Sequence, residues 1–173
     1  MSFFNQLEAE TKQDREALFS IPIIQDALRG EIKLNQYLAF LKEAYHHVKY
    51  TVPLLTACKN EISCDYPWLK EAMSHYIEDE MGHEEWILND IKAAGGKHEE
   101  IRHSEPSIFT ELMVADAYYQ IYQKNPIGFL GMVFVLEGTS IAIATNAAAA
   151  MQKSLQLPNE AFTYLSSHGS LDL

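Results

Sequence analysis

The chain has 173 residues, of which 47% are hydrophobic, so it is long enough for one domain with a single core. Its formal net charge is −11, from 24 acidic and 13 basic residues. Nucleic acids and anionic membranes are bound through basic faces, and this balance therefore argues against both as partners. Cys58 and Cys64 have no metal-binding spacing, and the N-terminus lacks the pattern of a signal peptide. We therefore expect a cytoplasmic protein.

Helical patterns fill the chain and no segment alternates with the period of a strand, which predicts an all-α fold. In chain order, the predicted helices cover residues 3–19, 22–28, 34–58, 67–93, 108–124, 127–155 and a last segment opened by Pro158 and Asn159. Pro53 is expected to kink the third helix near its end. Residues 97–107 are predicted to form a polar loop. Helix 127–155 is apolar on nearly every face, which predicts the buried centre of a bundle rather than a membrane span.

Two polar residues interrupt the apolar stripe of the predicted helix 67–93. The stripe steps by three or four residues and consists of Leu69, Met73, Tyr76, Glu80, His83, Ile87 and Ile91. This spacing places Glu80 and His83 on the face that points toward the interior. An uncompensated buried charge costs several kcal/mol. The stripe therefore predicts either a metal site or a buried polar network.

Glu137 is a second carboxylate expected to point inward. It is the only charged residue between Lys124 and Lys153, and it lies on the apolar helix 127–155. One interpretation is a single buried glutamate satisfied by a tyrosine hydroxyl or a backbone group. The other is that Glu80, His83 and Glu137 converge on a divalent metal. A mixed carboxylate and imidazole set suits Fe(II) or Mn(II) better than Zn(II).

The Glu-x-x-His pattern occurs at two further places, and by itself it is not specific. Glu100 and His103 lie in the predicted polar loop and are expected to face solvent. Glu43 and His46 lie beside the apolar stripe of helix 34–58, so we expect them on the surface. A ferritin-like site would need this pair to turn inward. His47 lies closer to the inward face, where it is either a satisfied core histidine or a ligand.

Three segments carry a resemblance to a known family: residues 76–90 (YIEDEMGHEEWILND), 135–138 (VLEG) and 168–172 (HGSLD). Together with the helix order, they resemble the haem-oxygenase-like superfamily, in particular the TenA/PqqC-like proteins known as iron-containing redox enzymes. The resemblance implies that residues 1–173 form one all-α domain, a haem-oxygenase-like bundle of about seven helices with an internal pocket.

The di-iron oxidase and oxygenase branch of this superfamily binds iron through a Glu and a His on one helix, a lone Glu, and a last helix that reads His-x-x-x-Asp-x-x-His. Carried over by position, the resemblance implies the metal ligands Glu80, His83, Glu137, His168 and Asp172. The final histidine of the pattern would fall three residues after Asp172, whereas the sequence ends at Leu173. The sequence therefore resembles a family member that lacks its C-terminal end.

The resemblance implies a non-haem iron oxidase or oxygenase that activates dioxygen on a small organic substrate in an apolar pocket. The expected cofactor is Fe(II), as two ions, with Mn as a substitute and without haem. Met132, Phe134 and Tyr76 are the expected pocket walls, and Tyr76 is also a candidate catalytic, redox-active neighbour of the site. A homodimer is the expected assembly.

Other branches of the superfamily leave two alternatives. A TenA-type hydrolase of aminopyrimidines would work without metal through a cysteine nucleophile, Cys58 or Cys64. A non-catalytic member would bind a ligand without turnover. Haem oxygenases hold haem through a histidine of the first helix, whereas the first histidine here is His46. The PqqC pocket is rich in His, Arg and Tyr, and the pocket expected here is more apolar and acidic.

Overall fold

A computed structural model describes the backbone of residues 2–171 and the side chains of residues 2–167. The helices are α1 (Phe3–Glu10), α2 (Lys12–Phe19), α3 (Pro22–Arg29), α4 (Leu34–Val48), α5 (Thr51–Glu61), α6 (Pro67–Glu80), α7 (His83–Ala93), α8 (His98–Arg102), α9 (Ile108–Gln123), α10 (Phe129–Leu155) and α11 (Thr163–Leu171). Short 3₁₀ turns, η1 (Pro126–Gly128) and η2 (Asn159–Ala161), precede α10 and α11. The described part of the chain contains no strand, so the all-α prediction is confirmed.

The structure has more helices than the expected seven because several predicted helices are divided. Helix 3–19 breaks at Thr11, and helix 34–58 breaks between α4 and α5 rather than at Pro53. Pro53 lies in the first turn of α5, where a missing N–H costs little. The segment 97–107, predicted to be a loop, contains the short helix α8.

The break between α6 and α7 is the one that bears on the candidate site. Helix 67–93 was expected to be continuous, but α6 ends at Glu80 and α7 begins at His83. Gly82 between them has φ +90°, a left-handed conformation that residues with a Cβ rarely adopt. The two polar residues of the apolar stripe therefore lie on either side of a sharp turn.

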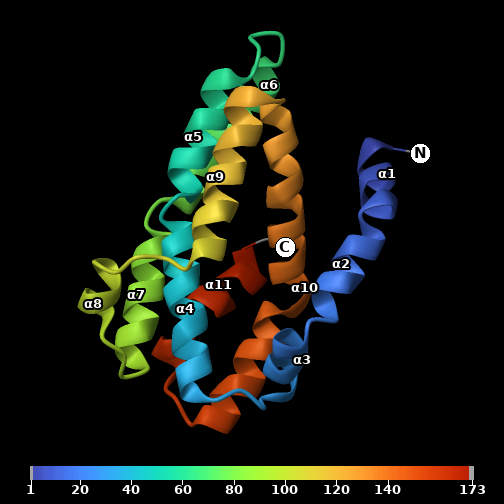
Figure 1. Cartoon of the computed structure of the whole chain (residues 1–173). Coiled ribbons are helices and arrows are strands. Elements are labelled where there is room, and N and C mark those ends of the chain that lie inside the picture. The colour runs from blue at the N-terminus through green and yellow to red at the C-terminus, as the bar shows by residue number, and fades with distance from the viewer. Residues whose placement is uncertain (1, 172–173) are drawn as a thin grey trace.

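Two clusters of buried side chains form the core. The α4–α7 cluster consists mainly of residues from α4 and α7, with others from α10 and η2. Its members include Tyr37, Leu41, Ile87, Ile91 and Ala148. The α5–α9 cluster includes Leu54, Leu55, Met73, Ile121 and Phe129. Helix α11 packs against α10 and α7, and α1 and α2 run along the outer side of α10 (Figure 1).

The expectation that helix 127–155 is buried throughout is wrong. The buried residues of α10 are Phe129, Ala144, Ala147, Ala148 and Met151, and the stretch 130–143 is half-buried or exposed. Ile141, for example, is 44% exposed. By length and composition, the segment Pro126–Leu155 could cross a membrane, but the core helices of soluble proteins pass the same test. In the apolar 18-residue window of this segment, 11% is buried.

The start of α11 is fixed by a carboxylate from α7. Asp90 is fully buried, and its Oδ2 accepts a hydrogen bond from the backbone N–H of Tyr164 at 2.9 Å. Its Oδ1 accepts from the backbone N–H of Thr163 at 3.1 Å and from the Thr163 hydroxyl. The first backbone N–H groups of a helix have no partner within the helix. Asp90 therefore anchors the helix that carries Tyr164.

Candidate functional site

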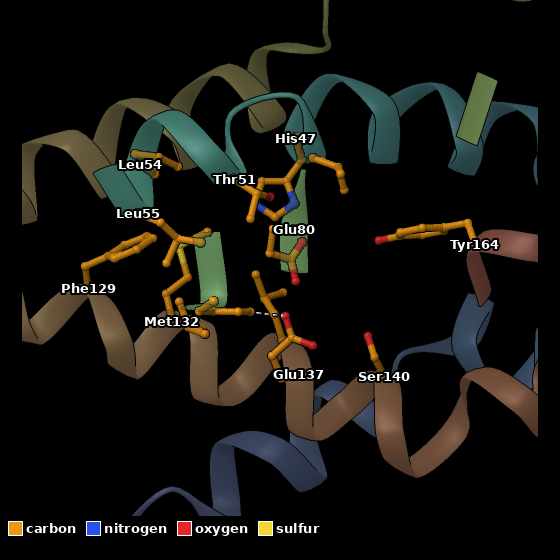
Figure 2. A pocket seen from close by; sticks show the side chains of 14 residues that line it. His47, Thr51, Leu54, Leu55, Glu80, Phe129, Met132, Glu137, Ser140 and Tyr164 are labelled. Carbon is orange, nitrogen blue, oxygen red and sulfur yellow. Dashed lines mark hydrogen bonds between the residues drawn. The ribbon is translucent and has the colours of Figure 1, made fainter. Parts of the chain in front are cut away.

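A cavity of about 100 Å³ lies where the two core clusters meet. Val48 of the α4–α7 cluster and Leu54, Leu55 and Phe129 of the α5–α9 cluster form part of its wall. The side chains with polar groups in this wall, contributed by α4, α5, α6, α10 and α11, include His47, Thr51, Tyr76, Glu80, Glu137, Ser140 and Tyr164 (Figure 2). The cavity is therefore an apolar space with a group of titratable side chains on its walls.

Glu80 and His83 form a buried pair beside this cavity. Their exposed fractions are 7% and 4%, and the Nδ1 atom of His83 lies 3.0 Å from Oε2 of Glu80. An ionised Glu80 is an acceptor, which favours the tautomer of His83 that carries its proton on Nδ1. The His83 ring also contacts Trp86, with ring centroids 4.1 Å apart. The pair is thus a buried polar contact, which is compatible with both a metal site and a buried polar network, the two outcomes that the interrupted stripe predicts.

Glu137 lies on another wall of the same cavity and is held by Tyr76. The Tyr76 hydroxyl donates a hydrogen bond of 2.7 Å to Oε1 of Glu137, across the space between α6 and α10 (Figure 2). A tyrosine hydroxyl as the partner of Glu137 was one of the two interpretations of this residue. It does not exclude a metal, because a carboxylate has further acceptor positions.

Two further residues line the cavity: His47, which the sequence left open as a core histidine or a ligand, and Tyr164, to which the sequence assigned no role. His47 points into the space that Glu80 and Glu137 also line in Figure 2. Burial lowers the pKa of its imidazole, and the Glu137 carboxylate opposes this shift. Burial raises the pKa of the Tyr164 phenol, and the charges of Glu137 and Glu80 act in the same direction. Tyr164 precedes His168 by four residues, a helical spacing that could have identified it.

Two of the three residues expected as pocket walls are among the described lining residues of this cavity. Tyr76 and Met132 line the cavity. Phe134 is not among its described lining residues, because its ring packs on the outer side of α10 against Phe4, at a centroid distance of 5.9 Å, with Arg15 over its face. The structure therefore does not support Phe134 as a pocket wall.

The second Glu-x-x-His pair points away from the cavity. Contrary to expectation, His46 is fully buried, with Nε2 2.9 Å from the hydroxyl of Ser104 and Nδ1 3.1 Å from Nζ of Lys49. Glu43 accepts hydrogen bonds from the Ser107 backbone and the Thr110 hydroxyl at the start of α9. Neither residue is among the described cavity-lining residues, so the ferritin-like arrangement finds no support.

The cysteines lie elsewhere as well. Cys58 is buried, its thiol donates to the carbonyl of Pro126 at 3.1 Å, and burial raises its pKa to about 11. Cys64 is exposed. Among the described lining residues of the cavity there is no cysteine. A thiolate is the nucleophilic form of cysteine, so this arrangement does not favour a cysteine hydrolase at this cavity.

Comparison with known proteins identifies the family. Residues 38–173 match the family model described as "Iron-containing redox enzyme", of the haem-oxygenase-like type. The chain belongs to this family. No curated protein matches the chain.

Comparison with solved structures shows that this member of the iron-containing redox enzyme family has the expected haem-oxygenase-like fold. One similar structure is a domain of unknown function with a heme oxygenase-like fold from Shewanella denitrificans OS217. It is 22% identical, with a TM-score of 0.85, over 99% of this chain and 74% of that one. Another is a TenA homolog from Pseudomonas syringae pv. tomato DC3000, 9% identical with a TM-score of 0.77, over 95% of this chain and 72% of that one. At these identities the likeness concerns the fold.

The donor chemistry of the site fits iron, although the described residues do not form a complete site. Within residues 2–167, whose side chains are described, no three His, Cys, Asp or Glu residues are grouped to hold a metal ion. Glu80 and His83 are in contact, and Glu80 and Glu137 share the cavity. Two carboxylates and an imidazole are ligands that suit Fe(II). The side chain of His168 and the whole of Asp172 lie outside the described residues.

Proposed function

We propose that this protein is a non-haem iron oxidoreductase that uses dioxygen to oxidise a small organic substrate. The observation that carries the proposal is the buried Glu80–His83 pair at the edge of a cavity that Glu137 also lines. Glu80 is buried and Glu137 half-buried, and each has a protein partner, His83 and Tyr76 respectively. Each carboxylate keeps further acceptor positions, which a bound cationic group could occupy. The family description, iron-containing redox enzyme, indicates iron as that group.

Glu80, His83 and Glu137 would hold the metal together with His168 and Asp172 from the C-terminal segment, and two ions are proposed. Carboxylates can bridge two cations, whereas imidazoles hold one each. Bound ferrous iron would supply electrons for the reduction of dioxygen. Manganese is the alternative occupant, because it prefers similar ligands.

The remaining side chains have roles that follow from their positions. The Oη atom of Tyr76 lies 2.7 Å from Oε1 of Glu137, so it orients this carboxylate and can donate its proton there. The lowered pKa of His47 keeps its imidazole neutral at pH 7, and the raised pKa of Tyr164 keeps its phenol protonated. In these protonation states the two groups can orient a polar group of the substrate, while the apolar walls exclude water.

An anaerobic Fe(II) titration, monitored by calorimetry, tests the proposal. The unmodified protein is expected to bind iron, and His83→Ala and Glu137→Ala are expected to lose that binding. The chain supplies a matched control, because Glu100 and His103 repeat the Glu-x-x-His spacing away from the cavity. Glu100→Ala and His103→Ala should therefore bind iron as the unmodified protein does. Unchanged binding in both cavity variants would refute the proposal.

A further inference from the structure

A second, larger cavity adjoins the first. Its volume is about 220 Å³, and its walls come from α3, α4, α10 and α11 with the segment between α3 and α4. Most lining side chains are apolar, for example Ile24, Ala27, Ile143 and Ala147. A cavity of 150 Å³ lined by apolar side chains stays dry and accommodates benzene. This space is therefore large enough for an apolar group of about six to nine carbon atoms.

Three of the polar side chains at this second cavity have hydrogen-bond partners within the protein. The Tyr37 hydroxyl donates to the backbone carbonyl of Ala161 at 2.6 Å, and the Thr139 hydroxyl donates to the carbonyl of Val135 at 2.6 Å. The Gln36 side-chain oxygen accepts from the backbone N–H of Lys33 at 2.8 Å. Water enters a cavity when several polar groups there need partners. These walls thus favour an apolar occupant over water.

The two cavities meet at α10 and α11. Ser140 lines both, and it follows Glu137 by three residues, which places the two on neighbouring positions of one face of α10. Tyr164 lines the first cavity and the next residue, Leu165, lines the second. Figure 2 shows Ser140 beside Glu137, both facing the space that Tyr164 also faces. A molecule in the second cavity would therefore end at the wall formed by Ser140, one helical turn from Glu137.

We infer that the second cavity holds the apolar part of the substrate, a ring or alkyl chain of about six to nine carbon atoms, and that the polar end of the substrate passes Ser140 toward Glu137. This inference rests on the proposed function, since it assigns the substrate class for the same site. It follows from the shared wall of the two cavities at Ser140 and from the contrast between the other residues of their walls. The substrate is thus an amphipathic molecule rather than one that is polar throughout.

Binding of neutral 1-alkanols of four to ten carbon atoms, measured by NMR titration, tests the inference. Each added CH₂ group that enters the cavity should tighten binding about fourfold, the fold-change given by about 0.8 kcal/mol, until the cavity is full. Intermolecular nuclear Overhauser effects in the unmodified protein should join the alkyl chain to the methyl groups of Ile24 and Ile143. Absence of saturable binding at every chain length would overturn the inference.

Two tryptophan substitutions on α10 form a matched pair. Ile143→Trp places a large ring in the second cavity and should weaken alkanol binding at least tenfold, whereas Ile141, two residues earlier, is exposed and lines neither cavity among the described residues. Ile141→Trp should therefore leave alkanol binding unchanged. Equal effects of the two substitutions, or nuclear Overhauser effects to other methyl groups only, would overturn the inference. If Ile143→Trp does not fold, the Overhauser measurement decides.

The Fe(II) titration separates this inference from the proposed function. Ile143→Trp leaves Glu80, His83 and Glu137 in place, so it should bind Fe(II) as the unmodified protein does. A protein that binds Fe(II) but no alkanol contradicts the assignment of the second cavity alone. A protein that binds alkanols with the expected chain-length dependence but no Fe(II) contradicts the iron proposal and leaves the apolar site standing.

Discussion

Replacement of Asp90 by Ala is expected to destabilise the protein through the N-terminus of α11. The side chain is fully buried and accepts three hydrogen bonds, two from backbone N–H groups and one from the Thr163 hydroxyl. Loss of a helix N-cap costs about 0.5–2 kcal/mol, and each buried donor left unsatisfied costs about 1–3 kcal/mol. Burial also raises the pKa of Asp90, so its charge is itself costly and offsets part of this loss. We therefore expect a net decrease of about 2–4 kcal/mol in the free energy of unfolding.

Thermal and urea unfolding measure this effect. For a domain of this size, 1 kcal/mol corresponds to about 2–4 °C in Tm, so Asp90→Ala should lower Tm by about 5–15 °C. Thr163→Val is the matched control, because it removes one hydrogen bond to Asp90 and keeps both backbone donors capped. It should cost about 1 kcal/mol. A change below about 0.5 kcal/mol in Asp90→Ala, the usual range for surface substitutions, would refute the reasoning.

Three further predictions concern the site and its surroundings. Gly82→Ala should cost about 1–2 kcal/mol because φ is +90°, and it should weaken Fe(II) binding in calorimetry by displacing His83 relative to Glu80. Tyr76→Phe removes the hydrogen bond to Glu137 and should cost about 0.5–1.5 kcal/mol in urea unfolding while slowing dioxygen consumption by the iron-loaded protein. Burial, with the charge of Lys49, lowers the pKa of His46. The free energy of unfolding should therefore be highest above the unfolded pKa of about 6.5 and should decrease as the pH falls below that value.

Each of these predictions has a control in the same chain. Gly95 also has a positive φ, of 81°, and a Cβ at either glycine would meet no neighbouring atom. Gly95→Ala should therefore cost similar stability and leave Fe(II) binding unchanged, and an equal loss of iron in both variants would contradict the role of Gly82. Tyr66→Phe changes an exposed tyrosine and should leave dioxygen consumption unaltered. His46→Gln cannot titrate, so a pH dependence as steep as that of the unmodified protein would contradict the assignment to His46.

The helical periodicity of the sequence predicted that Glu80 and His83 would be buried, because a stripe of apolar residues is a local property of the chain. It did not predict the break at Gly82, since both residues remain on the inward side with or without it. A glycine between two candidate ligands was the available signal. His46 is buried and hydrogen-bonded to Ser104, 58 residues away, and no local pattern of helix 34–58 could indicate that contact.

The apolar helix 127–155 shows the opposite limit. A helix that is apolar on every side has no stripe, so its sequence cannot tell which residues face the cavity. Met132 and Phe134 were therefore equivalent candidates, and only one lines the cavity. The number of elements that pack around a helix is set by the rest of the fold. Fewer elements cover α10 than its apolar composition suggested, as the exposure of Ile141 shows.

The position of the site follows from the way the two halves of the core are joined. Helix α6 packs against α5, whereas α7 packs against α4 and α11. Because the chain turns at Gly82, Glu80 belongs to one half and His83 to the other, yet their side chains are 3.0 Å apart. Glu137 and Tyr76 make a second polar contact, between α10 and α6. Any shift of α7 relative to α6 therefore changes the Glu80–His83 distance directly, and a metal held by both residues would stabilise one relative position of these two helices.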